Sequence, residues 1–244
     1  MSNCAIILAG GEGKRMKSNL PKPMSEVLGK PMLRWVIDSV KSAGVDDICV
    51  VKGYKKECID EFVSSLPFEV ETVYQAERLG TGHAVMMAKD FLEKHSGNVV
   101  ILNGDAPFMD AKTISDALAL HTEKGSVATV ISAKVSDPTG YGRIVRDENN
   151  NFLKIVEQKD CNEEEKKINE INSGGFWFNC EKLLSVLGEI KSDNNAKEYY
   201  LPDALKLLLD KNEVVSAFVD TVLGANDPEQ LKELNEIAKS KGYK

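Results

Sequence analysis

The chain has 244 residues, of which 42% are hydrophobic and 28% are charged, and its formal net charge at pH 7 is −7. This composition is that of an ordinary globular protein with one sizeable buried core. The acidic balance argues against a nucleic-acid-binding surface, and no apolar run approaches the ~20 residues of a membrane span. Because residues 1–3 lead into an apolar stretch without a signal-peptide pattern, we expect a cytoplasmic protein.

The five cysteines are odd in number and form no C-x-x-C pair. Neither a zinc site nor a disulfide framework is therefore predicted. We expect reduced residues that contribute to packing, at Cys4, Cys49, Cys58, Cys161 and Cys180.

Strand-like and helix-like patterns alternate through the first half of the chain. Short apolar runs predict strands at residues 4–8, 48–51, 70–74 and 99–102, and helical spacing predicts helices at 32–44, 59–66 and 84–92. A βαβαβαβ order is typical of a parallel sheet with helices on both faces. The sequence thus predicts an α/β fold with a Rossmann-like, doubly wound, mixed but mainly parallel sheet.

The second half changes character. Strand-like runs at residues 127–133, 143–145, 152–157 and 171–178 are separated by turn residues, and 148–151 has the composition of a hairpin tip. We expect these strands to be antiparallel and to form a smaller lobe. Pro202 starts a helix that includes 205–209, a strand follows at 214–219, and a closing helix covers 229–239. The charged run 162–167 is interpreted as a solvated helix face.

No repeat or Ser/Pro-rich linker divides the chain. We therefore expect a single domain over residues 1–244. Residues 1–125 form one half of it, 126–226 form the smaller lobe with a returning segment, and 227–244 contain the terminal helix.

A glycine-rich loop follows the first predicted strand, at the point where the chain must turn sharply. Gly10, Gly11 and Gly13 can adopt positive φ angles and allow backbone N–H groups to approach an anion. Positively charged side chains stand close by in the sequence, at Lys14, Arg15 and Lys22. The loop is therefore predicted to hold a polyphosphate, and the alternative is a plain flexible turn.

Two better-known glycine motifs do not fit this loop. A P-loop requires glycine where Leu8 stands and Ser or Thr where Arg15 stands. A dinucleotide fingerprint that starts at Gly11 requires glycine at Met16. The second mismatch also disfavours an NAD-dependent enzyme.

Two further polar segments follow apolar strands, and residues at the carboxyl ends of parallel strands converge in space. Asp105 places a carboxylate where a hard cation bound to phosphate could be held, or else it is a turn residue. The segment 75–84 carries amide and hydroxyl groups that can read a base edge, with Thr81 as a helix N-cap, and its alternative is an ordinary capped loop. His83 is interpreted as a packing or helix-start residue.

The run from Leu8 to Met16, followed by Pro21-Lys22, closely resembles the signature L-A-G-G-x-G-x-R-M and P-K of the sugar-1-phosphate nucleotidyltransferases, or sugar-nucleotide pyrophosphorylases. The segment 75–84, Q-x-x-x-L-G-T-G-H-A, resembles the N-terminal uridylyltransferase domain of bacterial bifunctional UDP-N-acetylglucosamine pyrophosphorylases. Similar segments follow in the family's order at 103–107, 140–143, 156–159, 170–174, 195–203 and 222–226. The resemblance covers nearly the whole chain.

The resemblance implies a role for each matching residue. Arg15 and Lys22 contact the transferring phosphates, and Asp105 and Asn226 ligate Mg²⁺. The implied nucleotide contacts are Leu8, Ala9, Gly10, Gly11, Gly13, Gln75, Gly80 and Thr81. The implied sugar contacts are Asn103, Gly140, Glu157, Asn172 and Tyr199. Residues 1–125 would then be the nucleotide-binding half and 126–226 the sugar-binding lobe with the metal-site return.

The implied reaction is Mg²⁺-dependent transfer of UMP from UTP to a sugar-1-phosphate, with N-acetylglucosamine-1-phosphate as the first choice. The alternatives are glucose-1-phosphate as acceptor and a non-catalytic nucleotide or sugar-phosphate sensor on the same fold. Four residues depart from the family's usual pattern: Ser25 replaces histidine, Lys14 threonine, Arg78 glutamine and Asn103 tyrosine. These departures leave the sugar open, and the sequence does not predict an oligomeric state.

Overall fold

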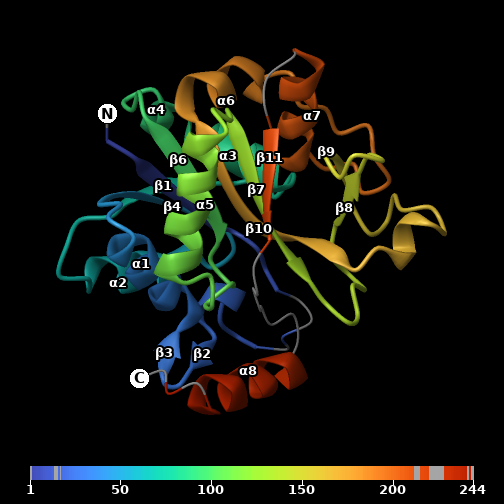
Figure 1. Cartoon of the computed structure of the whole chain (residues 1–244). Helices are drawn as coiled ribbons and strands as arrows, with labels where there is room; N and C mark the ends of the chain where they lie inside the picture. Colours follow the sequence, from blue (N-terminus) through green and yellow to red (C-terminus); the bar gives the residue numbers. More distant parts are fainter. Residues whose placement is uncertain are drawn as a thin grey trace.

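The computed structural model describes residues 2–13, 16, 18–211, 215–219, 228–240 and 242. Nine of its described strands form one sheet, whose main path runs β11, β7, β10, β6, β1, β4 and β5 (Figure 1). β1 (Cys4–Ala9) pairs in parallel with β4 (Asp47–Lys52) and β6 (Asn98–Asn103), and β5 (Glu71–Tyr74) pairs in parallel with β4. The carboxyl ends of these four strands therefore meet at one edge of the sheet.

The other part of the sheet is organised by β10 (Glu170–Asn179). This strand pairs antiparallel with β6 on one side and with β7 (Ala128–Lys134) on the other, and β11 (Val215–Val219) runs parallel to β7. The N-terminal part of β10 also pairs with β8 (Arg143–Arg146), which forms a hairpin with β9 (Phe152–Val156). The hairpin projects from the right of the sheet in Figure 1 and forms a smaller antiparallel lobe.

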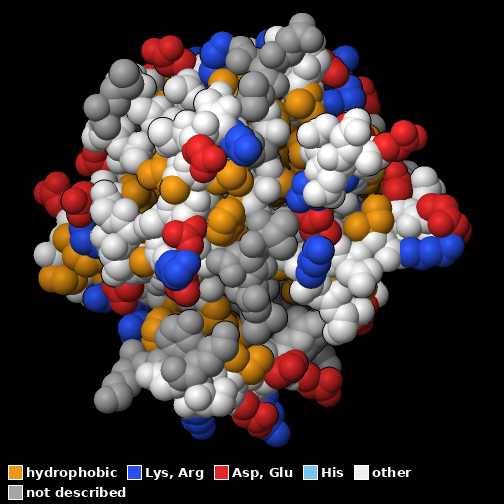
Figure 2. Space-filling model, viewed as in Figure 1, with side chains coloured by type: hydrophobic (Ala, Val, Ile, Leu, Met, Phe, Trp, Pro, Cys, Tyr) orange, Lys and Arg blue, Asp and Glu red, His pale blue; other side chains and the backbone are white. Residues whose placement is uncertain are grey.

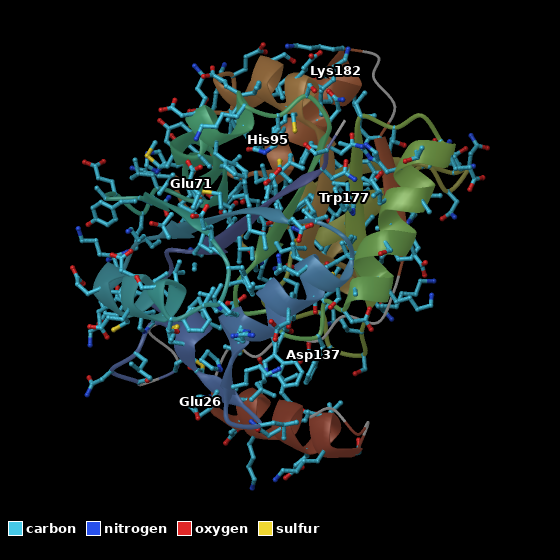
Figure 3. The ribbon with its side chains drawn as sticks, turned by 90° about the vertical axis from the view of Figure 1, so that its left-hand side faces the viewer. Glu26, Glu71, His95, Asp137, Trp177 and Lys182 are labelled. Carbon is cyan, nitrogen blue, oxygen red and sulfur yellow. The ribbon has the colours of Figure 1, made fainter. Side chains whose placement is uncertain are left out.

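Helices cover both faces of the sheet because successive side chains of a strand point to opposite faces. Ile7 packs into the core beneath α1 (Met32–Ser42), α2 (Lys56–Ser64) and α5 (Ala111–Glu123). In the same core Trp177, labelled in Figure 3, is fully buried and donates from Nε1 to the Ile114 carbonyl of α5 at 2.9 Å. This bond satisfies a polar group that would be costly to bury alone.

The opposite core lies beneath four shorter helices. Ile6 packs there against residues of α3 (Thr81–Met87), α4 (Lys89–Leu92), α6 (Cys180–Leu187) and α7 (Pro202–Asp210). Cys4, Cys49 and Cys180 are fully buried in this core, and all five cysteines are free. The prediction of packing residues agrees with this arrangement for these three cysteines, whereas Cys58 is only half-buried.

α8 (Pro228–Ser240) packs at the bottom of the molecule in Figure 1, against the short strands β2 (Glu26–Val27) and β3 (Lys30–Pro31). Leu234 and Ala238 of α8 join Val27 and Trp35 in a third, small core. Asn235 Oδ1 accepts a hydrogen bond from the backbone N–H of Leu28 at 2.8 Å. α8 is therefore attached to β2 and to the neighbouring residues of α1 rather than to the main sheet.

Most predicted elements are confirmed, and the α/β fold with a mainly parallel mixed sheet is as predicted. Several details differ. The strand pair β2–β3 is not predicted. α5 and α6 are absent from the prediction, the helix expected at 84–92 is divided into α3 and α4, and the charged run 162–167 contains only the short 3-10 helix η3 (Glu165–Lys167). Thr81 is not the N-cap of α3, because Gly80 holds that position with a φ of 108° that favours glycine.

The surface carries charges of both signs. On the face shown in Figure 2, acidic and basic side chains are interspersed and not gathered in one region. Among the described residues we find no helix that has both the length and the apolarity required to cross a membrane.

Candidate active site

The glycine loop begins where β1 ends, at Gly10. The backbone carbonyl of Gly10 accepts a hydrogen bond from Tyr54 N at 3.0 Å, and the Gly53 backbone is so close that a Cβ there would lie 2.5 Å from the Gly10 carbonyl oxygen. Of the three loop glycines, Gly13 alone has a positive φ, of 63°. A Cβ on Gly13 would lie 2.6 Å from Lys22 Cβ, so the glycine allows Lys22 to approach the loop. The conformational freedom expected for this loop is therefore used at Gly13.

Two hollows lie at the carboxyl ends of the parallel strands. The first, the loop hollow, has a volume of about 570 Å³ and is lined by the glycine loop and the loop between β5 and α3. Its lining includes Gly10, Gly11, Glu12, Gly13, Gln75, Arg78, Gly80 and Glu198. The second, the lobe hollow, has a volume of about 230 Å³ and lies between the sheet and the antiparallel lobe. Its lining includes Ala106, Gly140, Tyr141, Gly142, Glu157, Asn172, Ser173, Gly174, Leu201 and Pro202.

The two hollows share one boundary, which we call the seam. Its residues line both hollows and are Leu8, Lys22, Thr81, Asn103 and Asp105. Gly104 N donates to the Leu8 carbonyl at 2.9 Å, which holds the end of β6 beside the end of β1. Lys22, on the 3-10 helix η2 (Lys22–Met24), places Nζ 2.5 Å from Asp105 Oδ2. A cation and a carboxylate from different segments thus meet where the hollows join.

Gln75 is buried at the end of the loop hollow. Its Nε2 donates to the Gly80 carbonyl at 3.1 Å and lies 3.1 Å from Nδ1 of His83. His83 therefore orients the Gln75 amide from within α3. From the sequence, His83 is expected only to be a packing or helix-start residue, and this contact is not predicted.

A segment from the C-terminal part of the chain, residues 194–201, is fixed to the loop between β5 and α3. Tyr199 N donates to the Leu79 carbonyl and Gly82 N donates to the Tyr199 carbonyl, both at 2.7 Å. Leu201 N donates to Thr81 Oγ1 at 3.0 Å. At its other end the segment contacts the lobe, because Asn195 bonds Asp160 Oδ1 and the Lys159 carbonyl, both at 3.2 Å.

Tyr199 and Ala9 are expected site residues that line neither hollow. The ring of Tyr199 lies against His83, with ring centroids 6.2 Å apart, and its main chain makes the two bonds to the loop. Ala9 is fully buried at the end of β1. Neither side chain is brought to the seam.

Glu157 has a strongly perturbed environment in the lobe hollow. The pKa of its carboxyl is raised from 4.5 to about 7, first by burial and then by the negative charges of Asp160 and Asp203, while Arg143 opposes them. Arg143 is buried and bonds the Tyr141 carbonyl and Gln158 Oε1, so it holds the wall of this hollow in place. Near neutral pH the Glu157 carboxyl can both donate and accept a hydrogen bond.

Asn172 lies on β10 at an irregularity of the strand. The register between β10 and β7 shifts between Asn172 and Gly175, and Gly174 has a φ of 82°. Asn172 Oδ1 accepts a bond from Gly174 N at 2.9 Å. A Cβ on Gly174 would collide with the side-chain amide of Asn103. The bulge thus brings the expected sugar contacts Asn103 and Asn172 to the same hollow.

Two expected site residues, Arg15 and Asn226, lie outside the described residues, as does the neighbouring Lys14. Within the described part of the chain, no group of three or more His, Cys, Asp or Glu side chains could hold a metal ion. Asp105 is the carboxylate at the seam, where the Lys22 ammonium already lies against it. Mg²⁺ commonly takes only one or two protein carboxylates together with water and substrate phosphates, so a single carboxylate at the seam fits this ion.

Two acidic side chains of the loop hollow, Glu12 and Glu198, are not predicted as site residues. A signal for Glu12 is its position between the glycines of the loop, but its negative charge opposes the phosphate cradle predicted there. Glu198 belongs to the segment 194–201, whose approach to the loop is not visible in any local pattern.

Comparisons with known proteins agree with this geometry. Residues 4–233 match the family described as nucleotidyl transferase. The chain is 44% identical to the bifunctional protein GlmU of Clostridium botulinum (strain Loch Maree) and 46% identical to that of Clostridium beijerinckii, each over 244 residues. Each match covers 99% of this chain and 53% of the relative, so the chain spans about half the length of these curated relatives.

Solved structures share the fold. One is described as a glucose-1-phosphate thymidylyltransferase from Bacillus anthracis in complex with sucrose, with a TM-score of 0.81, 22% identity and coverage of 100% of this chain and 98% of that one. Another is a UDP-glucose pyrophosphorylase complexed with UDP-glucose, with a TM-score of 0.83, 18% identity and coverage of 99% and 100%. Because the family match extends over most of a chain that also has this fold, the chain belongs to the nucleotidyl transferase family.

Proposed function

We propose that this chain transfers UMP from UTP to a sugar-1-phosphate, with N-acetylglucosamine-1-phosphate as acceptor, and releases pyrophosphate. The observation that carries this proposal is the seam. A hollow lined by the glycine loop and Gln75 and a hollow lined by Glu157 and Asn172 have a common boundary at Lys22 and Asp105. Two substrates in neighbouring hollows would present their phosphates to each other at that boundary.

The chemistry requires no general base. A sugar phosphate with a second pKa near ~6 is largely dianionic at neutral pH, so its oxygen can attack the α-phosphorus of UTP directly. The new oxygen–phosphorus bond forms as the bond from the α-phosphorus to the bridging oxygen of pyrophosphate breaks. Lys22 and the loop N–H groups would stabilise the charge on the phosphates, as would Arg15 by resemblance. Holding both substrates at one seam supplies the proximity that such a transfer needs.

Asp105 is the residue that we assign to Mg²⁺, together with Asn226. When bound, the ion would neutralise negative charge on phosphate oxygens. We assign the base to Gln75, Gly80 and Thr81. The sugar is assigned to Asn103, Gly140, Glu157, Asn172 and Tyr199, of which the first four line the lobe hollow. For Tyr199 the proposal requires its ring to leave its position beside His83.

The direct test is release of pyrophosphate when the protein is mixed with Mg²⁺, UTP and a panel of sugar-1-phosphates. We expect release with N-acetylglucosamine-1-phosphate, and less with glucose-1-phosphate. A preference for glucose-1-phosphate would correct the acceptor and leave the reaction in place. If UTP binds but no member of the panel gives pyrophosphate, the chain is a sensor on this fold and the catalytic proposal is wrong.

A further inference from the structure

Glu12 is out of place in the loop hollow if phosphates bind there. It lies between Gly11 and Gly13, its side chain is 30% exposed, and it lines the hollow. A carboxylate at this position repels a triphosphate, and the repulsion is only partly screened so near the protein surface. A nucleotide site that contains Glu12 therefore needs a group that offsets this charge.

Arg78 is placed to offset it. The side chain comes from the loop between β5 and α3, and its Nη2 lies 3.3 Å from Glu12 Oε2 across the loop hollow, which both residues line. The guanidinium carbon also lies 5.8 Å from the ring centroid of Tyr54, within the range of a cation–π contact. Tyr54 N in turn bonds the Gly10 carbonyl. Arg78 thus contacts the glycine loop through Glu12 and the loop between β4 and α2 through Tyr54.

We infer that Arg78 is a positioning residue of the nucleotide site, which acts by neutralising Glu12. This inference rests on the proposed function. The pair is nearly uncharged as a unit, so the polyphosphate meets the loop N–H groups and cations without an opposing carboxylate. The effect of Arg78 on nucleotide affinity must therefore grow with the charge of the phosphate chain, and this effect must disappear when Glu12 is removed.

A double-mutant cycle separates this role from a direct phosphate contact. Dissociation constants for UTP and UMP are measured by calorimetry at low ionic strength for the wild type, Arg78→Gln, Glu12→Gln and the double variant. Arg78→Gln should weaken UTP binding about tenfold and UMP binding about twofold, because the site then holds one positive charge fewer beside the Glu12 carboxylate and the phosphates. The double variant should bind UTP within about twofold of the wild type. The loss in Arg78→Gln should shrink at high salt.

Lys94→Gln is the matched control. Lys94 pairs with Glu71, labelled in Figure 3, at 3.1 Å, is 58% exposed and lines neither hollow. The variant loses the same unit of charge as Arg78→Gln, so unchanged UTP binding shows that net charge alone is not responsible.

Three results would overturn the inference. If the double variant binds UTP as weakly as Arg78→Gln does, Arg78 contacts the phosphates itself. If Arg78→Gln binds UTP like the wild type, the pair is an ordinary surface ion pair. If the wild-type protein binds neither nucleotide, the proposed function is wrong and this inference falls with it.

Discussion

Asp105 has a cation beside it, since Lys22 Nζ lies 2.5 Å from its Oδ2. The Asp105 side chain is 27% exposed, so water reaches the carboxylate, and an asparagine at this position keeps an oxygen that can accept a hydrogen bond from Lys22. The carboxylate is therefore better explained by what it can bind than by what it stabilises. A substitution of Asp105 should therefore change turnover more than it changes stability.

We expect Asp105→Asn to lower turnover by about 10²–10³, the usual cost of removing one electrostatic contact to a reacting group. The free energy of unfolding should change by less than about 1 kcal/mol. Pyrophosphate release at saturating Mg²⁺ and urea denaturation measure the two quantities. Asp38→Asn is the control, because Asp38 pairs with Lys30 and Arg34 on the surface, away from both hollows. Near-normal turnover of Asp105→Asn would remove Asp105 from the site.

The antiparallel lobe is joined to the main sheet by an ion pair that spans two strands. Arg146 of β8 donates from Nε and Nη2 to the two carboxylate oxygens of Glu170 on β10, at 2.8 and 2.6 Å. Ser132 of β7 donates to Glu170 Oε1 at 2.7 Å. Burial alone would raise the pKa of Glu170, but the bonds from Arg146 and Ser132 reverse the effect and lower it. The carboxylate is therefore charged and depends on its partners.

Arg146→Met should destabilise the protein by about 2–3 kcal/mol, because it leaves a largely buried carboxylate without its cation. Arg146→Met combined with Glu170→Gln should recover part of this loss. Lys206→Met, which breaks the exposed pair of Lys206 and Asp210 on α7, should cost less than about 0.5 kcal/mol. Urea denaturation of the four proteins gives these values. Equal losses for Arg146→Met and Lys206→Met would contradict the role assigned to the Arg146 pair.

Secondary structure could be predicted where the apolar spacing is regular. The prediction failed where polar residues form part of the buried face. α1 buries Leu33, Val36, Ile37 and Val40, which the pattern shows directly. In α5 the buried face includes Thr113 and His121, and a search for apolar spacing does not count them. α6 follows β10 without a break, since Asn179 ends the strand and also caps the helix by accepting from Lys182 N.

Part of the candidate site could also be predicted from the sequence. Residues that follow parallel strands, such as Gln75 and Asp105, lie where the sheet topology places them. The approach of Tyr199 to Leu79 and Gly82 depends on main-chain bonds, which any residue type can make and which leave no pattern in the sequence. The roles of Arg15 and Asn226 stay predictions, because both residues lie outside the described residues.

Two buried titratable groups give the whole molecule opposing responses to pH. Burial and neighbouring negative charges raise the pKa of Glu157 from 4.5 to about 7, so between these values the folded protein keeps a proton that the unfolded chain has released. Stability therefore falls as pH rises through this window. Burial lowers the pKa of His121 from 6.5 to about 4, so the unfolded chain binds the extra proton and stability rises with pH between these values.

We expect Glu157→Gln to stabilise the protein at about pH 8 by roughly 1–3 kcal/mol relative to its effect at about pH 5. His121→Asn, which retains a polar group toward Thr129 Oγ1, should lose the rise in stability between about pH 5 and pH 6.5. Free energies of unfolding from urea titrations across this range measure both slopes. If Glu157→Gln shifts stability equally at every pH, the Glu157 carboxyl titrates in the same way in both states.

The segment 194–201 is bonded at one end to Leu79 and Gly82 beside the loop hollow and at the other to Lys159 and Asp160 beside Glu157. The two hollows can therefore not be engineered independently from every segment of the chain. A randomised library confined to residues 140–142 alters the lining of the lobe hollow only, so on the proposed function it can change the acceptor while the donor is retained. A library in 194–201 disturbs both walls at once, because the same main chain supports them. Variants selected there for a new sugar will carry altered nucleotide preferences as a by-product.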